Sequence, residues 1–168
     1  MGVSRASFRF AGGAAALLGL CCAARVAHAD ELLISDPGVH PDYFLEAEPH
    51  ALLEPFDKDP KFGVGFRGTI ELIDNGFVQT INNTVGLGFG LDWVDGRFTV
   101  PIVMQWNFWL SDNWSVFGEP GGAIRFGKGD TKPVPVLMGG GRLHFSDYIA
   151  LTLRAGYPSF SVGISFLF

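Results

Sequence analysis

Acidic and basic side chains recur at alternate positions within segments that are otherwise apolar. Alternate residues of a β-strand point to the same face, so these charges are expected to share one side of a sheet. Buried charges are costly unless they are paired, and the planar guanidinium group of arginine can bind a carboxylate through two hydrogen bonds. The chemistry predicted for this set is therefore mutual ion pairing. Its members are Glu46, Glu48, Glu54, Arg67, Glu71, Asp92, Glu119, Arg125, Arg142 and Arg154.

The tripeptide His144-Phe145-Ser146 is a second candidate for chemistry. It resembles the His-x-Ser element of the outer-membrane lipid A deacylases, barrels in which a serine and a histidine hydrolyse an ester. The resemblance implies catalytic roles for His144 and Ser146 in a hydrolase that acts on lipid A. The alternative interpretation is a turn serine that follows a histidine facing the interior of a barrel.

Other reactive motifs do not fit. Residues 122–128 match the first seven positions of a phosphate-binding loop, but Gly129 replaces the required serine or threonine and a further strand follows instead of a helix. His40, His50 and His144 lack the spacing of metal ligands, so no metal and no cofactor is expected. The formal net charge of the chain is −5, and an acidic chain of this kind is not expected to bind nucleic acid.

The elements that would position these residues are short antiparallel strands. Apolar residues alternate with polar residues or glycine in seven segments, which turn signals such as Asp95-Gly96 and the stretch 127–133 separate. A closed bacterial barrel uses an even number of strands, so residues 43–55 are predicted to form an eighth, although two prolines in it lack a hydrogen-bond donor. The seven segments are 62–72, 84–93, 100–108, 114–126, 137–145, 149–156 and 160–168.

The last of these segments carries the clearest pattern. Phe160, Val162, Ile164, Phe166 and Phe168 share one face, and the final residue is aromatic. This pattern resembles the C-terminal signature of outer-membrane barrels, which the barrel-assembly machinery reads. The resemblance implies that machinery as a partner, with these five side chains as the assembly signal.

The first 29 residues have the pattern of a secretory signal peptide. Arg5 and Arg9 precede an apolar run over 11–24, and Ala27-His28-Ala29 forms an A-x-A cleavage site. The run is shorter than the roughly 20 residues that a spanning helix needs. Cleavage is expected after Ala29, leaving a periplasmic tail at 30–42 and a barrel domain at 43–168.

The distribution of charge between the two strand faces favours a membrane barrel over a soluble one. A soluble barrel of the lipocalin kind has an apolar interior, whereas here the charged face is the one predicted to point inward and the opposite face is nearly free of charge. Inward glycines leave space for long charged side chains in a lumen that side chains can just fill, so the lumen is predicted to be plugged. These glycines are Gly63, Gly65, Gly86, Gly88, Gly90 and Gly163.

Residues 43–168 resemble the small eight-stranded outer-membrane barrels, the class of the OmpA transmembrane domain and OmpX. Two segments also look like uncharacterised outer-membrane barrel proteins, namely FRGTIELIDNGFVQTINNTVGLGFGLDW and VPIVMQWNFWLSDNWSVFGEPG. The resemblance implies an all-β, closed antiparallel up-and-down transmembrane barrel of about eight strands, monomeric and surrounded by the outer-membrane lipids of a Gram-negative-type bacterium. The function expected is a non-enzymatic structural or interaction role in the envelope, with a charge-plugged lumen. The alternatives are the lipid A-modifying hydrolase and a narrow channel.

Overall fold

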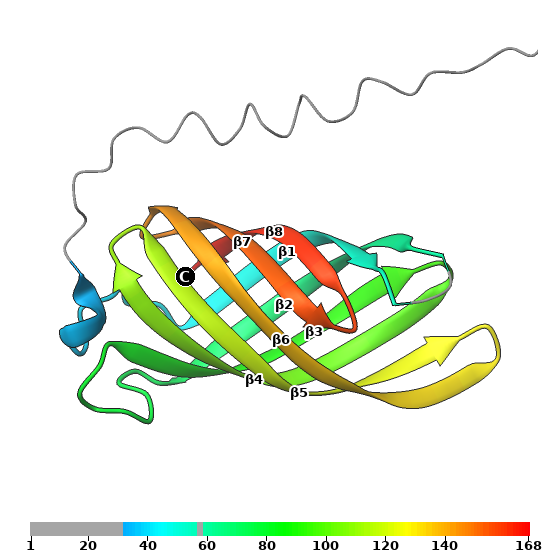
Figure 1. The fold of residues 1–168 in the computed structure, drawn as a ribbon, viewed down its shortest axis with the longest axis horizontal. Helices are drawn as coiled ribbons and strands as arrows, with labels where there is room; N and C mark the ends of the chain where they lie inside the picture. Colours follow the sequence, from blue (N-terminus) through cyan, green and yellow to red (C-terminus); the bar gives the residue numbers. More distant parts are fainter. Residues whose placement is uncertain (1–31, 57–58) are drawn as a thin grey trace, which may run out of the picture. The chain divides into compact units, whose positions relative to one another are not determined.

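A computed structural model describes residues 32–56 and 59–168, and the predicted signal peptide lies outside these ranges. In the described residues, eight strands form one closed antiparallel sheet in which each strand pairs with its neighbours in sequence and β8 pairs with β1 (Figure 1). The predicted all-β, up-and-down barrel is confirmed. The strands are β1 (Leu45–Glu54), β2 (Lys61–Ile73), β3 (Asn83–Val94), β4 (Arg97–Ser111), β5 (Trp114–Gly127), β6 (Asp130–Ser146), β7 (Ile149–Tyr157) and β8 (Phe160–Leu167).

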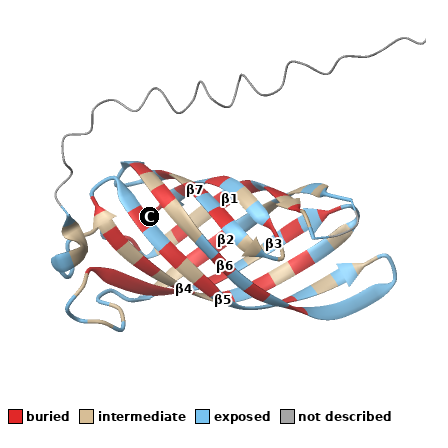
Figure 2. Cartoon of the chain, viewed as in Figure 1, coloured by how far each residue is buried: buried red, intermediate tan, exposed pale blue. Residues whose placement is uncertain are grey.

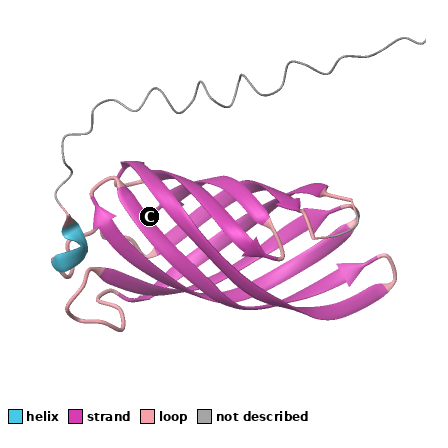
Figure 3. Cartoon of the chain, in the orientation of Figure 1, coloured by secondary structure: helices cyan, strands magenta, loops and turns pink. Residues whose placement is uncertain are grey.

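Helical structure is minor in the described part of the chain. It consists of the short 3-10 helix η2 (Leu33–Ser35), which precedes β1 (Figure 3). No helix within the described ranges has the length and apolar character needed to cross a membrane.

Buried and exposed residues alternate along the strands, because successive side chains of a strand point to opposite faces (Figure 2). On β4, for example, Val103 and Gln105 are buried, whereas Ile102 is exposed. Polar and charged side chains make up much of the enclosed face, and large apolar side chains cover much of the outer face. The barrel therefore has the reverse of the apolar interior that a lipocalin-like fold would have.

The predicted strand at 43–55 is also confirmed, with the narrower bounds of β1. Pro49 stands opposite Phe66 of β2, whereas the ladder between β1 and β8 is interrupted at Glu48 and Pro49. Its pairs run from Ala47 with Phe166 directly to His50 with Gly163. This interruption accommodates a residue that has no amide donor.

The turn predicted at 127–133 is narrower in the structure. The turn consists of Lys128 and Gly129, both with positive φ, and β6 already begins at Asp130. Pro133 and Pro135 lie inside β6, where they pair with β5 alone, because β7 ends at Tyr157 opposite Leu137. Proline is tolerated in a strand that has a neighbour on one side only. The β5–β6 hairpin consequently extends beyond the adjacent strands (Figure 1).

The two ends of the barrel differ in the segments that pack against them. The end that holds Phe168 and the turns after β2, β4 and β6 is called the C-terminal end here, and the other is called the hairpin end. Residues of the expected N-terminal tail pack against the C-terminal end, where Asn82 donates its backbone N–H to Ile34 and its side-chain amide to Val39. Tyr43, Trp109 and Leu167 form a buried cluster at the same end.

Candidate functional site

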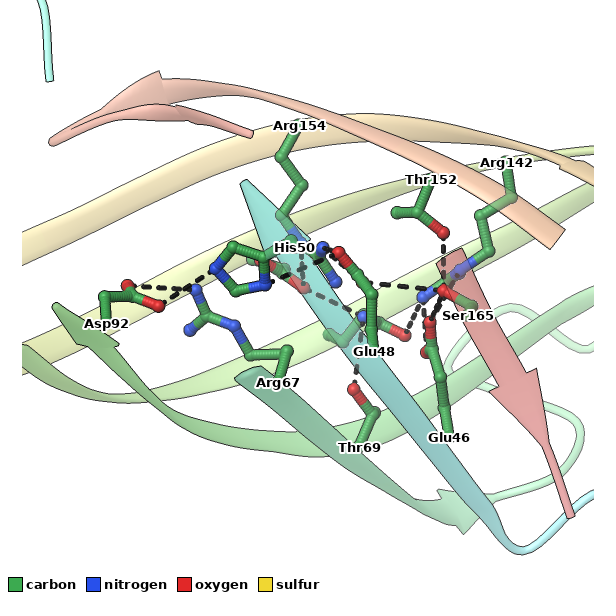
Figure 4. Close-up of polar contacts among 12 residues, drawn as sticks. Glu46, Glu48, His50, Arg67, Thr69, Asp92, Arg142, Thr152, Arg154 and Ser165 are labelled. Atoms are coloured by element: carbon green, nitrogen blue, oxygen red, sulfur yellow. Dashed lines mark hydrogen bonds and ion pairs between the residues drawn. The ribbon is translucent and has the colours of Figure 1, made fainter. Parts of the chain in front are cut away.

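Arg154 on β7 is the centre of a polar cluster in the middle of the lumen. Its Nη1 donates to both carboxylate oxygens of Glu48 on β1. Its Nε lies 3.2 and 3.1 Å from the two carboxylate oxygens of Glu119 on β5. These three side chains are at most 2% exposed, so one guanidinium group joins opposite walls of the barrel away from water (Figure 4).

Arg142 on β6 is the second guanidinium centre. Its Nε and Nη2 donate to the two carboxylate oxygens of Glu46 at 3.0 and 2.5 Å, the bidentate geometry that arginine favours. The same group also donates to the side-chain oxygens of Asn107 and Gln105, at 2.8 and 3.0 Å. Gln105 in turn donates to Glu119 at 2.8 Å. The two centres therefore belong to one hydrogen-bonded network.

Two hydroxyl groups complete the network on the β7–β8 side. Ser165 donates to Glu46 at 2.6 Å, and its Oγ lies 2.5 Å from the hydroxyl oxygen of Thr152 (Figure 4). Both hydroxyl residues are fully buried. The carboxylate of Glu46 is thus held by a guanidinium group and a hydroxyl group together.

The ring of Phe117 on β5 packs against the two guanidinium groups of the cluster. The guanidinium carbons of Arg142 and Arg154 lie 4.4 and 5.0 Å from the centroid of its ring. A cation over an aromatic face is attracted by the quadrupole of the ring, and the attraction grows when water is excluded. The ring therefore stabilises two positive charges that have been removed from solvent.

A looser group extends the cluster toward the hairpin end. Nε2 of His50 lies 3.0 Å from Oδ1 of Asp92, and Nδ1 of His50 lies 3.7 Å from Glu48. Arg67 reaches Asp92 at 3.6 Å through Nη2, while its Nε and Nη1 have no hydrogen-bond partner among the described residues (Figure 4). Arg67 is therefore buried with much weaker compensation than Arg154.

Glu54, Arg125 and Glu71 occupy the two mouths of the lumen and not its centre. Glu54 accepts hydrogen bonds from Arg125 and from Arg97 at the hairpin end. Glu71 lies near the end of β2 at the C-terminal end, half-buried, and its Oε2 has no hydrogen-bond partner among the described residues. The structure thus places seven of the ten predicted charges together in the middle of the lumen. These seven are Glu46, Glu48, Arg67, Asp92, Glu119, Arg142 and Arg154.

The structure does not bring together His144 and Ser146, the two residues of the alternative hydrolase interpretation. A register shift between them turns Ser146 to the surface, where its Oγ accepts a hydrogen bond from the backbone of Tyr148. His144 points inward, and its Nε2 lies 3.0 Å from Oγ of Ser115 instead. Ser115 is fully buried, and Nδ1 of His144 has no hydrogen-bond partner in the described chain.

A stack of aromatic rings closes the C-terminal end. His40, from the N-terminal segment, stacks on Trp109 with the ring centroids 5.4 Å apart, and His144 lies on Trp109 at 4.9 Å. Trp109 is 1% exposed and also meets the edge of Tyr43. The N-terminal segment and the barrel wall together therefore cover this mouth of the lumen.

The five residues of the predicted assembly signal face outward along β8. Their exposed fractions run from 36% at Phe166 to 68% at Phe168, and β8 pairs with both β7 and β1. The backbone of Phe168 is joined to β1, since its N–H donates to Leu45 and its carbonyl accepts from Phe44. The members are Phe160, Val162, Ile164, Phe166 and Phe168.

Sequence reasoning missed the uncharged members of the network. Gln105 and Asn107 lie at the polar positions of the alternating segment 100–108, and Thr152 and Ser165 lie at polar positions of the last two segments. The same alternation that selected the charges could have selected them, because a buried amide or hydroxyl group also needs a partner. Trp109 was missed because the predicted strand stopped at Phe108, one residue short.

Comparisons with known proteins give information about the fold only. No protein-family model matches the sequence, and no curated protein matches it. Among solved structures, the barrel is similar to one from the de novo design of transmembrane β-barrels, with a TM-score of 0.55 and 12% sequence identity. The similarity covers 79% of this chain and 98% of the designed one. This similarity shows a shared barrel architecture.

Proposed function

We propose that this chain is a non-enzymatic outer-membrane barrel whose lumen is closed by its own charged side chains, with a structural or interaction role in the envelope. The observation that carries the proposal is the network around Arg154 and Arg142, which links opposite walls of the lumen with almost no exposure to water. A barrel of this strand number has an interior that side chains just fill. The aromatic stack over the C-terminal end adds a second closure.

The outer wall supports a membrane location. Large apolar side chains are exposed on every strand from β2 to β8, far more than a water-facing surface normally gathers into one band. Aromatic side chains gather near both ends of this wall, as they do at the two interfaces of membrane barrels. Phe62, Trp93 and Tyr157 lie toward the hairpin end, and Trp114, Phe145 and Phe168 lie toward the C-terminal end.

The route to that location is the part of the proposal that comes from the sequence. A signal peptide cleaved after Ala29 would deliver the chain to the periplasm, and the outward residues of β8 would be read by the barrel-assembly machinery. The protein would then be a monomer in outer-membrane lipid, in the class of the small eight-stranded barrels, with its N-terminal segment at the periplasmic face. The hairpin end would face the exterior.

Conductance of the purified mature protein in planar lipid bilayers tests the closed lumen directly. We expect no steady current above the lipid background. In cells, we expect the mature protein in the outer-membrane fraction, and we expect it to migrate faster on gels before boiling than after. A barrel-sized steady conductance would overturn the plug and favour the narrow channel. Recovery of the protein in the soluble periplasmic fraction, without the heat-dependent shift, would overturn the membrane location.

A further inference from the structure

Basic side chains gather at the hairpin end, although the whole chain is acidic. Lys61 and Lys128 both contact the carboxylate of Asp95, at 3.4 and 2.7 Å. Hydrogen bonds from these lysines, Lys128 first, hold the pKa of Asp95 below its ordinary value. Two lysines therefore share one acid.

Glu54 is shared in the same way by two arginines. Arg125 binds one of its carboxylate oxygens, and Nη2 of Arg97 lies 3.4 Å from the other. Arg125 also donates from Nε to the hydroxyl group of Thr99 at 3.1 Å, which fixes the plane of its guanidinium group. Two arginines therefore share the carboxylate of Glu54.

Lys132 adds a fifth positive charge. It stands directly opposite Arg125 in the β5–β6 register, so the two side chains share the inner face of the protruding hairpin. Within the described residues Lys132 is exposed and forms no ion pair. Two like charges placed opposite each other in a sheet are destabilising unless an anion lies between or beside them.

A hollow lies where these side chains converge. Its volume is about 190 Å³, and Arg97, Arg125, Lys128 and Lys132 line it together with Gly127 and Asp130. Since a water molecule occupies about 30 Å³ in the liquid, the hollow has room for a small anionic group and part of its hydration. Asp130 is the acidic group in the lining, and its charge would oppose an anion.

We propose that this hollow is a binding site for a phosphate group. A guanidinium group held in plane can give a phosphate two parallel hydrogen bonds, and lysines supply point charges for its remaining oxygens. A phosphate monoester carries close to two negative charges at neutral pH. This charge suits a hollow whose described lining has four cations and one acid better than a single carboxylate would. The phosphate could come from free inorganic phosphate or from a phosphorylated glycolipid headgroup of the surrounding leaflet.

Calorimetric titration of the full mature protein in a neutral detergent tests the site. One arm uses inorganic phosphate, and the other uses diphosphorylated lipid A in the same micelles, with its dephosphorylated form as the blank. Saturable binding in the lipid arm alone identifies the headgroup as the source, and saturable binding in both arms identifies free phosphate as sufficient. Absence of saturable binding in both arms would overturn the proposal.

Three variants locate the binding. Lys132→Gln should weaken it about tenfold, the effect of losing one charge-assisted hydrogen bond. Asp130→Asn should strengthen it, because it removes the opposing charge from the lining. Lys61→Gln, a matched loss of charge at the same end but outside the lining, should have little effect. If Lys61→Gln and Lys132→Gln weakened binding equally, the phosphate would be responding to the overall charge of the rim, and the site would be refuted. Lys132 is exposed, so its variant is not expected to affect folding.

Discussion

Gly140 on β6 lies directly under the ring of Phe117. A Cβ atom at position 140 would be 2.2 Å from Cζ of that ring and 2.5 Å from the backbone oxygen of Leu153. Phe117 in turn carries the guanidinium groups of Arg142 and Arg154. Because Gly140 has no side chain, the ring of Phe117 can lie close to β6. The position of this ring in turn determines where the two guanidinium groups lie in the lumen.

Gly140→Ala should consequently destabilise the barrel by more than its added methyl group suggests. Neither the ring nor the backbone oxygen can withdraw cheaply, and overpacking of this kind costs about 1–3 kcal/mol. Gly139→Ala is the matched control, because a Cβ there would meet only an ordinary contact at 3.7 Å. Urea unfolding in detergent micelles measures both, and equal midpoints would show that the ring is free to move.

Removal of Arg154 should be among the most damaging substitutions in the lumen. Arg154→Ala leaves Glu48 and Glu119 buried without their main partner, and breaking a buried ion pair from one side costs about 3–5 kcal/mol. Lys128→Ala, at an exposed position of the hairpin end, should change the free energy of unfolding little. The same unfolding experiment compares them, and similar losses would contradict the buried network.

Arg67→Ala should cost clearly less than Arg154→Ala. Arg67 has one ion-pair contact at 3.6 Å, and two of its nitrogens lack partners in the described chain, so its removal also relieves a desolvated cation. Arg67→Met keeps the length of the side chain and should be nearly neutral. A loss as large as that of Arg154→Ala would mean that water completes a strong site around Arg67.

Deletion of Phe168 should lower the yield of assembled barrel while leaving secretion intact. The residue closes the last rung to β1 through its backbone and presents an exposed ring at the C-terminal end. Phe168→Tyr keeps both features and serves as the control. Pulse-labelling followed by separation of heat-modifiable from unfolded protein gives the fractions. Unchanged assembly after the deletion would refute an assembly role for this residue.

Lys128→Gln should raise the pKa of Asp95 toward its ordinary value, because Lys128 is the strongest of the groups that lower it. A carboxyl group with a lowered pKa adds stability above its unfolded value of about 3.9, and this contribution disappears as the pH falls through the folded value. The carboxyl carbon of Asp95, followed by NMR between pH 2 and 6, reports the shift. An unmoved titration would show that Lys61 alone sets it.

The strand pattern was predictable because successive residues of a barrel strand face two different environments in turn, the lumen and the outer surface. The alternation from Phe160 to Phe168 needs no knowledge of distant contacts, and Asp95-Gly96 marks a two-residue hairpin turn through its positive φ angles. The stretch 127–133 was misread because proline usually ends a strand. Only the short partner β7 reveals that Pro133 lies where no second neighbour is required.

The charges of the lumen could be named from the sequence, but their partners could not. Alternation places Glu46 and Arg142 on the inner face, yet 96 positions separate them along the chain, and their contact depends on the stagger of the strands around the barrel. The pairing of His144 with Ser115 in place of Ser146 has the same origin. It follows from a register shift between β6 and β7, which a three-residue motif does not reveal.

The two prolines of β6 have a consequence for how copies of the protein meet. The part of β6 beyond β7 is a stretch of the described sheet with an open side, and an open strand can pair with a second chain that extends the ladder. Pro133 and Pro135 withhold two amide donors from that side at every other position. The two prolines therefore disfavour polymerisation of the protein through the exposed side of this hairpin.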